Sequence, residues 1–337
     1  MLFSLEKKQN ENTMPYKLSF LIPANTEEFL KNTVEDILAN TSEETEVIVG
    51  LDGKWSNPPL LQHPRVSVIY SPVTIGQRKM TNLCARLSKA KYVCKADAHT
   101  AYDKDFDKKM FEAFEKAGDN AVIIPIMKNL HVYDFKCYKC GYKVYQDVKP
   151  ICPGCGTTMK KKLVWKPRRG TNSRAYCFDS EPHFQYFNEY TQRDEYKKDL
   201  EETGLTQSMS IQGSFYMMTR EKYMAMAESR EELGSWGGEG ISIACRFWLS
   251  GGKVLINHKT HYSHCFRTKG DVFGFPYTQS GRECQRTKQR VKDMIWNKKC
   301  PGQIYPVSWL VSRFFPVKGW DEKSLKELKE YESGKHR

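Results

Sequence analysis

The sequence has no run of 18 apolar residues, and its first 15 positions hold no apolar signal core. The first absence argues against a transmembrane helix, and the second argues against secretion. Acidic residues are scarce, since 40 Asp and Glu stand against 53 Lys and Arg, which leaves a net charge of +13. We therefore expect a cytoplasmic protein with no membrane partner, and the sequence indicates no obligate protein partner. A basic surplus of this size favours an acidic partner such as nucleic acid or a phosphorylated ligand.

The composition is that of a folded protein. The 337 residues include 39% apolar and 12% aromatic side chains, which excludes a disordered chain and provides for a sizeable core. Eleven cysteines without a signal sequence favour metal ligands in a reducing compartment over disulfides.

The basic surplus is concentrated in two windows. Residues 136–169 hold 10 basic side chains and a single acid, Asp147, and residues 282–299 hold seven basic and two acidic side chains. An ordinary solvated surface does not require such clustering, so these windows are the predicted contact regions for an anionic partner.

Short apolar runs alternate with segments of helical spacing in the first 130 residues. Strands are predicted over 17–22, 47–51, 66–70, 92–96 and 121–126, and helices after a Thr26 cap and over 77–87 and 106–117. The alternation predicts an α/β fold, a mainly parallel sheet flanked by helices. Because ligands bind at the carboxyl ends of such strands, Pro23, Asn25, Asp52 and Asp97 should lie along one rim.

The sequence divides into five predicted parts. These are a flexible tail (1–15), a first half with the strand and helix alternation (16–130), a cysteine-rich insertion (131–170), a second half (171–280) and a basic helical extension (281–337).

Two matching CxxCG knuckles lie inside the insertion. Cys137 and Cys140 form the first and Cys152 and Cys155 the second, so four thiolates can complete a closed tetrahedral Zn²⁺ site. The doubled pattern argues against redox pairs or disulfides, and a closed site predicts a structural ion. Its basic and tyrosine-rich flanks allow two roles, a nucleic-acid-binding face or a staple that holds a loop to the catalytic part.

Three further segments carry potential catalytic groups. Asp97 and His99 alternate after a predicted buried strand, and His264 ends another, so together they suit Mn²⁺ or Mg²⁺. Such an ion would bridge a donor pyrophosphate. The string from Trp236 to Glu239 combines an aromatic ring, a glycine turn and a carboxylate at a helix start, and Arg267 could bind phosphate bidentately.

At these motifs the chain resembles the polypeptide N-acetylgalactosaminyltransferases and, more broadly, the A-type glycosyltransferases. The resembling pieces occur in family order: LSFLIPAN, VIVGLDG, the segment ending in KADAHT, Gln212-Gly-Ser-Phe, SWGGEGISIACRFWLSGGKV, HYSHCFR and Phe275-Pro-Tyr-Thr278. They cover about half of the chain, and the run from Trp236 to Arg267 is the most specific.

The resemblance implies that 16–130 is the nucleotide-sugar-binding half and 171–280 the acceptor and catalytic half, with 131–170 as a zinc ribbon insertion. It also implies roles for individual residues. Asp97, His99 and His264 would bind the catalytic manganese, and Glu239, Trp236 and Arg267 would be catalytic. The donor UDP-sugar would be bound by Pro23, Asn25, Asp52, Arg78, Asp97, Gly213, Gly238 and Tyr277. Arg267 and Tyr277 would belong to a loop that closes over the diphosphate and keeps water out. Family members retain the anomeric configuration, so a retaining hexosyltransferase is the expectation.

The departures from the family lie on the acceptor side. The family usually continues WGGE with Asn and places Glu two residues later, where this chain has Gly240 and Ser242. The ribbon and the basic windows are also additions to the family plan. The leading hypothesis is transfer to a hydroxymethylated pyrimidine in DNA, a modification known in bacteriophages, which would take place in the host cytoplasm. The alternatives are a saccharide or protein Ser/Thr acceptor and, more remotely, a non-catalytic nucleic-acid-binding protein on a transferase scaffold.

Overall fold

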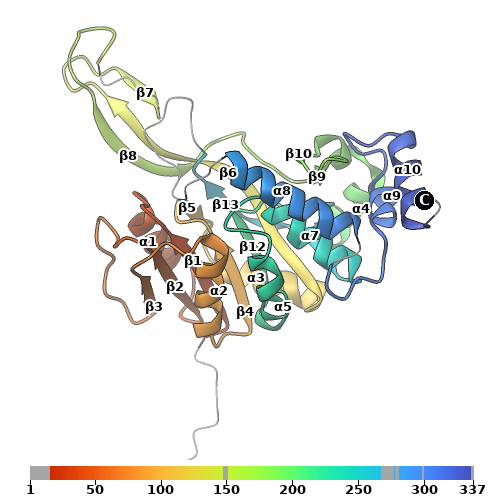
Figure 1. Cartoon of the computed structure of the whole chain (residues 1–337). Helices are drawn as coiled ribbons and strands as arrows, with labels where there is room; N and C mark the ends of the chain where they lie inside the picture. Colours follow the sequence, from red (N-terminus) through yellow and green to blue (C-terminus); the bar gives the residue numbers. More distant parts are fainter. Residues whose placement is uncertain (1–15, 147–150, 267–276, 278–280, 298–299, 335–337) are drawn as a thin grey trace, which may run out of the picture.

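The computed structural model describes residues 16–146, 151–266, 277, 281–297 and 300–334. Its main sheet follows the order β11-β13-β6-β12-β4-β1-β2-β3, and β5, β7 and β8 pair outside this path (Figure 1). The strands with parallel partners are β1 (Leu18–Ala24), β2 (Thr45–Asp52), β3 (Val66–Ser71), β4 (Tyr92–Ala96), β6 (Ala121–Lys136) and β13 (Lys253–His264). The antiparallel strands of the main sheet are β5 (Thr100–Tyr102), β11 (Leu205–Gln207) and β12 (Phe215–Thr219).

Apolar residues explain why these segments are central strands. All seven residues of β1 and all five of β4 are buried, as expected for strands covered on both faces. The predicted α/β fold with a mainly parallel sheet is confirmed. Because β1, β2 and β4 run in parallel, their carboxyl ends lie along one edge of the sheet.

Helices cover the sheet, and helices also form the C-terminal part of the described chain. They are α1 (Leu30–Asn40), α2 (Gln77–Leu87), α3 (Phe106–Ala117), α4 (Asp194–Thr203), α5 (Arg220–Ala225), α6 (Ala227–Glu231), α7 (Glu239–Leu249), α8 (Gly281–Trp296), α9 (Val307–Phe314) and α10 (Glu322–Glu332). A short hairpin of β9 (Tyr176–Phe178) and β10 (Phe184–Tyr186) precedes the 3₁₀ helix η1 (Asn188–Gln192). No described helix combines the length and the apolar character that a membrane crossing would need.

The start of α1 differs from the prediction. The helix begins at Leu30, and Thr26 does not cap it but takes a left-handed conformation with φ of 57°. Its hydroxyl donates to the side-chain oxygen of Asn25 at 2.8 Å. Three residues, 27–29, therefore separate this turn from the helix.

The cysteine-rich segment forms an arm that projects from the body of the molecule (Figure 1). β6 is 16 residues long and crosses position 131, where the sequence predicts the insertion to begin. Its first part pairs with β13, and its second part pairs with β7 (Lys143–Tyr145) and β8 (Lys160–Pro167). The arm is thus a continuation of the central sheet.

A second hydrophobic cluster lies where the arm joins the body. It is separate from the main core and contains ten buried residues: Phe29, Ala101, Leu130, Val132, Tyr133, Phe135, Cys137, Cys152, Met159 and Cys265. In this cluster, cysteines of the arm lie together with residues of the main sheet or next to it, such as Ala101 of β5 and Cys265 directly after β13.

Candidate active site

A cavity of about 500 Å³ opens beyond the carboxyl ends of β1 and β4. Residues on its wall include the predicted Pro23, Asp97, His99, Gly213, Trp236, Gly238, Glu239, His264 and Tyr277. They come from distant parts of the sequence, and the sheet brings them together. Ligand-sized cavities at this edge are typical of open α/β sheets.

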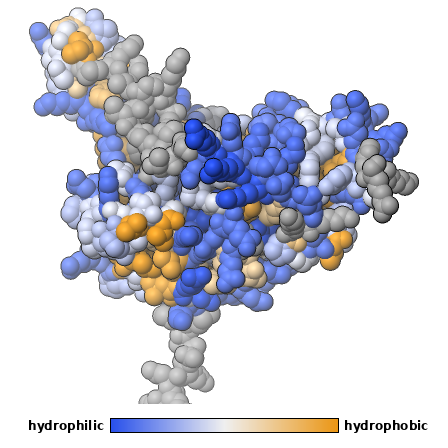
Figure 2. Space-filling view, in the orientation of Figure 1, coloured by the Kyte–Doolittle hydropathy of each residue, from blue (hydrophilic) through white to orange (hydrophobic). Residues whose placement is uncertain are grey.

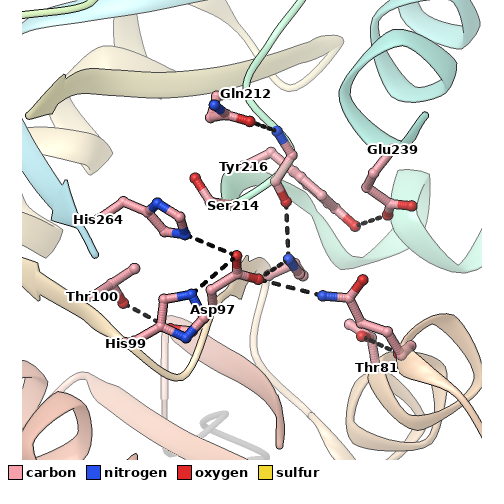
Figure 3. Close-up of polar contacts among 12 residues, drawn as sticks. Thr81, Asp97, His99, Thr100, Gln212, Ser214, Tyr216, Glu239 and His264 are labelled. Atoms are coloured by element: carbon pink, nitrogen blue, oxygen red, sulfur yellow. Dashed lines mark hydrogen bonds and ion pairs between the residues drawn. The ribbon is translucent and has the colours of Figure 1, made fainter. Parts of the chain in front are cut away.

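One carboxylate and two imidazoles converge inside the cavity (Figure 3). Nε2 of His264, the last residue of β13, lies 3.2 Å from Oδ2 of Asp97, and Nε2 of His99 lies 3.9 Å from the same oxygen. The potential ligand atoms of the three residues all lie within 4.8 Å of one another. This donor set fits a single divalent ion that accepts oxygen and nitrogen ligands, such as Mn²⁺.

Electrostatics keep two of these ligands in metal-binding form. Burial alone would raise the pKa of Asp97, but the charge of Lys95 and the hydrogen bond to His264 hold it well below its ordinary value. Burial lowers the pKa of His264 to about 4. At neutral pH the carboxylate is therefore ionised and this imidazole is neutral, as metal ligation requires.

His99 has a second carboxylate beside it. Burial would lower the pKa of His99, but the Glu27 carboxylate, 3.1 Å from Nδ1, raises it above its ordinary value. The Nδ1–H group donates to Glu27, which leaves Nε2 facing Asp97.

Lys95 and Gln77 contact the other carboxylate oxygen of Asp97, Oδ1. The Lys95 ammonium pairs with Oδ1 and donates to the carbonyl oxygen of Gly213 at 2.9 Å, and Gln77 Nε2 lies 3.3 Å from Oδ1. Neither residue is among the site residues predicted from the sequence. A signal existed for Lys95, because residues two apart at a strand end share one face.

Glu239 belongs to a buried network of charges. Its carboxylate accepts hydrogen bonds from Arg78 Nε at 2.8 Å, from the Tyr216 hydroxyl at 2.7 Å and from Arg230. Arg78 also donates to the carbonyl oxygens of Gly234 and Gly237. Burial would raise the pKa of Glu239, but the two guanidinium groups hold it well below its ordinary value. The network fixes the loop that carries Trp236.

Three predicted donor-binding residues take positions behind the cavity wall. Asn25 donates to Thr74 Oγ1 at 3.1 Å, and the buried Asp52 carboxylate accepts from the backbone N–H groups of Ile75 and Gly76 at 2.7 and 2.9 Å. Arg78 is 1% exposed and engaged with Glu239 and the glycine loop. These residues brace the turns that shape the cavity, and their contact with the donor stays a prediction. The predicted Arg267 lies outside the described residues.

The four cysteines of the arm form the second metal-ligand cluster. Their sulfur atoms lie within 4.8 Å of one another, with Cys137–Cys155 and Cys140–Cys152 separations of 3.4 Å. In each knuckle the trailing glycine has positive φ, and its N–H returns to the carbonyl oxygen of the first cysteine, at 3.0 Å for Gly141 and 2.9 Å for Gly156. Four convergent thiols with no other ligand fit a structural Zn²⁺.

Comparison with known proteins matches this chain to glycosyltransferases. Residues 19–166 match the family described as Glycosyl transferase family 2. A stretch of 109 residues is 30% identical to "Probable N-acetylgalactosaminyltransferase 6" of Caenorhabditis elegans and covers 32% of this chain and 17% of that protein. A stretch of 104 residues is 33% identical to "Putative polypeptide N-acetylgalactosaminyltransferase 13" of Drosophila melanogaster, with 31% and 17% covered. The matches thus span less than a fifth of these relatives.

A solved structure, "Crystal structure of GalNAc-T7 with UDP, GalNAc and Mn2+", superimposes with a TM-score of 0.62 at 15% identity. The similarity covers 93% of this chain and 54% of that chain. The fold is therefore the A-type glycosyltransferase fold.

Proposed function

We propose that this chain is a metal-dependent glycosyltransferase that moves a sugar from a UDP-sugar to a hydroxyl acceptor with retention of configuration. The observation that carries the proposal is the convergence of Asp97, His99 and His264 in the cavity of an A-type glycosyltransferase fold. The similar solved structure contains UDP, GalNAc and Mn²⁺, which is the ligand set that this donor site would take.

The proposed chemistry assigns tasks to residues on the cavity wall. A divalent ion held by the triad would neutralise charge on the donor diphosphate as the sugar departs. The Lys95 ammonium lies between the triad and Gly213, so it adds positive charge where the diphosphate meets the sugar. Trp236, 39% exposed, would cover the sugar, and Gly238 would leave it room. Tyr277 and Arg267 would close the site and exclude water.

We further propose that the acceptor is a hydroxymethylated pyrimidine in DNA, as in bacteriophage DNA modification. The two basic windows lie on elements that adjoin residues of the cavity wall. The arm starts beside Asn129, which pairs with His264, and Thr287 and Val291 of the basic helix α8 lie against Gly237 and Gly238. Figure 2 shows the hydrophilic surface of α8.

Side chains on the arm suit nucleic acid. Lys160, Lys162, Lys166 and Arg168 are exposed, as are Tyr138 and Tyr142. Lysine and arginine side chains bind phosphates, while exposed rings stack on bases. A base inside a duplex would be reached by flipping or through a groove.

A protein Ser/Thr or saccharide acceptor is the second candidate. The observation in its favour is that the curated relatives are named as N-acetylgalactosaminyltransferases, three of them as polypeptide enzymes of Drosophila and Xenopus species. A non-catalytic nucleic-acid-binding protein is the remote candidate, and the intact triad argues against it.

The decisive assay offers UDP-glucose, UDP-GalNAc and UDP-GlcNAc with Mn²⁺ to three acceptors. These are DNA with hydroxymethylcytosine, matched unmodified DNA and a Ser/Thr peptide. Sugar on the modified DNA alone would support the DNA proposal. Labelled peptide would instead support a protein acceptor. Donor hydrolysis without labelled DNA would support the proposed donor site and contradict the DNA acceptor. Failure to bind or turn over any donor would overturn the glycosyltransferase proposal.

A further inference from the structure

Residues 27–29, between β1 and α1, contact both the candidate metal site and the arm. Glu27 Oε2 accepts from Nδ1 of His99 at 3.1 Å. Glu28 pairs with Lys161 of β8 at 3.1 Å. The Phe29 ring packs against Tyr133 and Trp165, with ring centroids 6.3 and 6.1 Å away. One short segment therefore joins a potential metal ligand to the arm.

Glu27 is placed as a carboxylate that hydrogen-bonds to a metal-binding histidine without contacting the metal itself. The Glu27 side chain is 2% exposed and that of His99 is 10% exposed, so water competes little for this hydrogen bond. With Nδ1 engaged, the ring presents Nε2 to Asp97. A carboxylate behind a histidine fixes the tautomer and the ring orientation, and it makes the ring a better metal ligand.

The arm holds the segment from the other side. Phe29 belongs to the second hydrophobic cluster together with Cys137 and Cys152 of the two knuckles and with Cys265, which directly follows His264. Trp165 Nε1 also donates to Asp36 Oδ2 of α1 at 3.0 Å. Thr26, just before the segment, has φ of 57°, which β-branched residues rarely adopt. Contacts on both sides, more than local preference, therefore define this turn.

We propose that Glu27 is a positioning residue for the metal ligand His99, and that the zinc-bound arm keeps Glu27 in place through Glu28 and Phe29. This inference rests on the proposed function, because it concerns the metal site of that function. It gives the four-cysteine cluster a role in the catalytic centre in addition to any role in acceptor binding. Zinc in the arm and manganese in the cavity are then coupled through one segment.

The first test measures Mn²⁺ affinity by electron paramagnetic resonance of the free ion, without donor or acceptor. Glu27→Gln keeps the size of the side chain but removes its charge, and we expect Mn²⁺ binding to weaken about 10- to 100-fold. Zinc content, measured by mass spectrometry, should stay that of the wild type. Glu35→Gln, on the exposed face of α1, is the matched control and should bind Mn²⁺ as the wild type does.

The second test removes zinc from the arm. Cys140→Ser combined with Cys155→Ser should abolish zinc binding and weaken Mn²⁺ binding about fivefold or more, while circular dichroism shows that the body remains folded. Phe29→Leu keeps all four cysteines and removes only the ring packing, and it should also weaken Mn²⁺ binding. If the cysteine variant does not fold, Mn²⁺ binding by the Phe29→Leu variant decides whether the arm and the metal site are coupled.

The outcomes separate this inference from the proposed function. Wild-type Mn²⁺ affinity in Glu27→Gln would overturn the positioning role, and wild-type affinity in the zinc-free and Phe29→Leu variants would overturn the coupling. Either result leaves the glycosyltransferase proposal standing. A wild-type chain that binds no Mn²⁺ would instead remove the metal site on which both depend.

Discussion

Two partly buried carboxylates, Asp97 and Glu239, have different neighbours within one cavity. One carboxylate oxygen of Asp97 pairs with Lys95 and the other faces two imidazoles, so Asp97 can bind a metal. Glu239 is surrounded by Arg78, Arg230 and Tyr216, so its charge is already matched within the protein. The surroundings thus distinguish a ligand from a structural anion.

For Asp97 the expected result concerns activity. Asp97→Ala should lower sugar transfer at least about 100-fold and leave the fold intact, because the proposed triad would lose its carboxylate. Transfer assays and circular dichroism would measure the two effects. Asp119→Ala, a half-exposed acid paired with Lys91, is the control and should keep full activity. Substantial residual transfer in Asp97→Ala would take Asp97 out of the metal site.

For Glu239 the expected result concerns stability. Glu239→Gln should lower the free energy of unfolding by about 3–5 kcal/mol at pH 7, because two buried guanidinium groups lose their anion. The folded-state pKa of Glu239 is depressed below 4.5, so its contribution is present above that pH and is lost as pH falls through the folded-state pKa. Urea unfolding at pH 7 and at pH 3 should therefore show a smaller difference at pH 3. Equal differences at both pH values would contradict the charge argument.

At the scale of elements, the start of α7 depends on a close approach of two backbones. A Cβ atom built on Gly240 would overlap the carbonyl oxygen of Ile211 and lie 3.3 Å from the backbone nitrogen of Gly213. The resembling family usually has Asn at this position. In this chain the 211–213 segment fills the space that such a side chain would need, so Gly240 lets this segment lie directly against the start of α7.

Gly240→Ala tests this packing. Because the obstacle is backbone, the helix start must shift, and we expect a loss of about 2 kcal/mol or more of stability together with weaker donor binding. Thermal unfolding and titration with the donor would measure both. Gly281→Ala is the matched control, since a Cβ there meets nothing within 4 Å. Wild-type stability in Gly240→Ala would show that the 211–213 segment can move away.

At the scale of the whole molecule, the basic arm and the basic helix α8 stand beside a cavity lined largely by the sheet edge and the glycine loop. Arm and cavity are connected through β6, in which Asn129 pairs with His264 near the middle of the strand and the last residue, Lys136, directly precedes the first knuckle.

Charge reversal on the arm tests this arrangement. Lys160→Glu with Lys162→Glu should weaken acceptor DNA binding and lower the slope of log affinity against log salt by up to about two, one for each lost phosphate contact. Lys161 is spared because it pairs with Glu28. Lys323→Glu with Lys326→Glu, exposed on α10, is the control and should leave the slope unchanged. An unchanged slope in the arm variant would remove the arm from DNA binding.

Local patterns in the sequence determined the fold class and both ligand sets. Apolar runs alternating with helical spacing define the parallel sheet, the doubled CxxCG spacing defines the four-cysteine cluster, and Asp97 and His99 point the same way because they alternate at a strand end. These features depend on neighbours within a few residues. For that reason they could be predicted without the rest of the structure.

Tertiary structure alone decided which groups surround those ligands. Nothing in the sequence indicates that Glu27 lies behind His99, 72 positions away, or that Arg78 donates a hydrogen bond to Glu239, 161 positions away. The Thr26 turn was likewise set by contacts on both sides, against the local preference for a helix cap. Charge partners and close approaches are properties of the packed chain, because burial and distance decide whether a carboxylate binds a metal, an imidazole or an arginine.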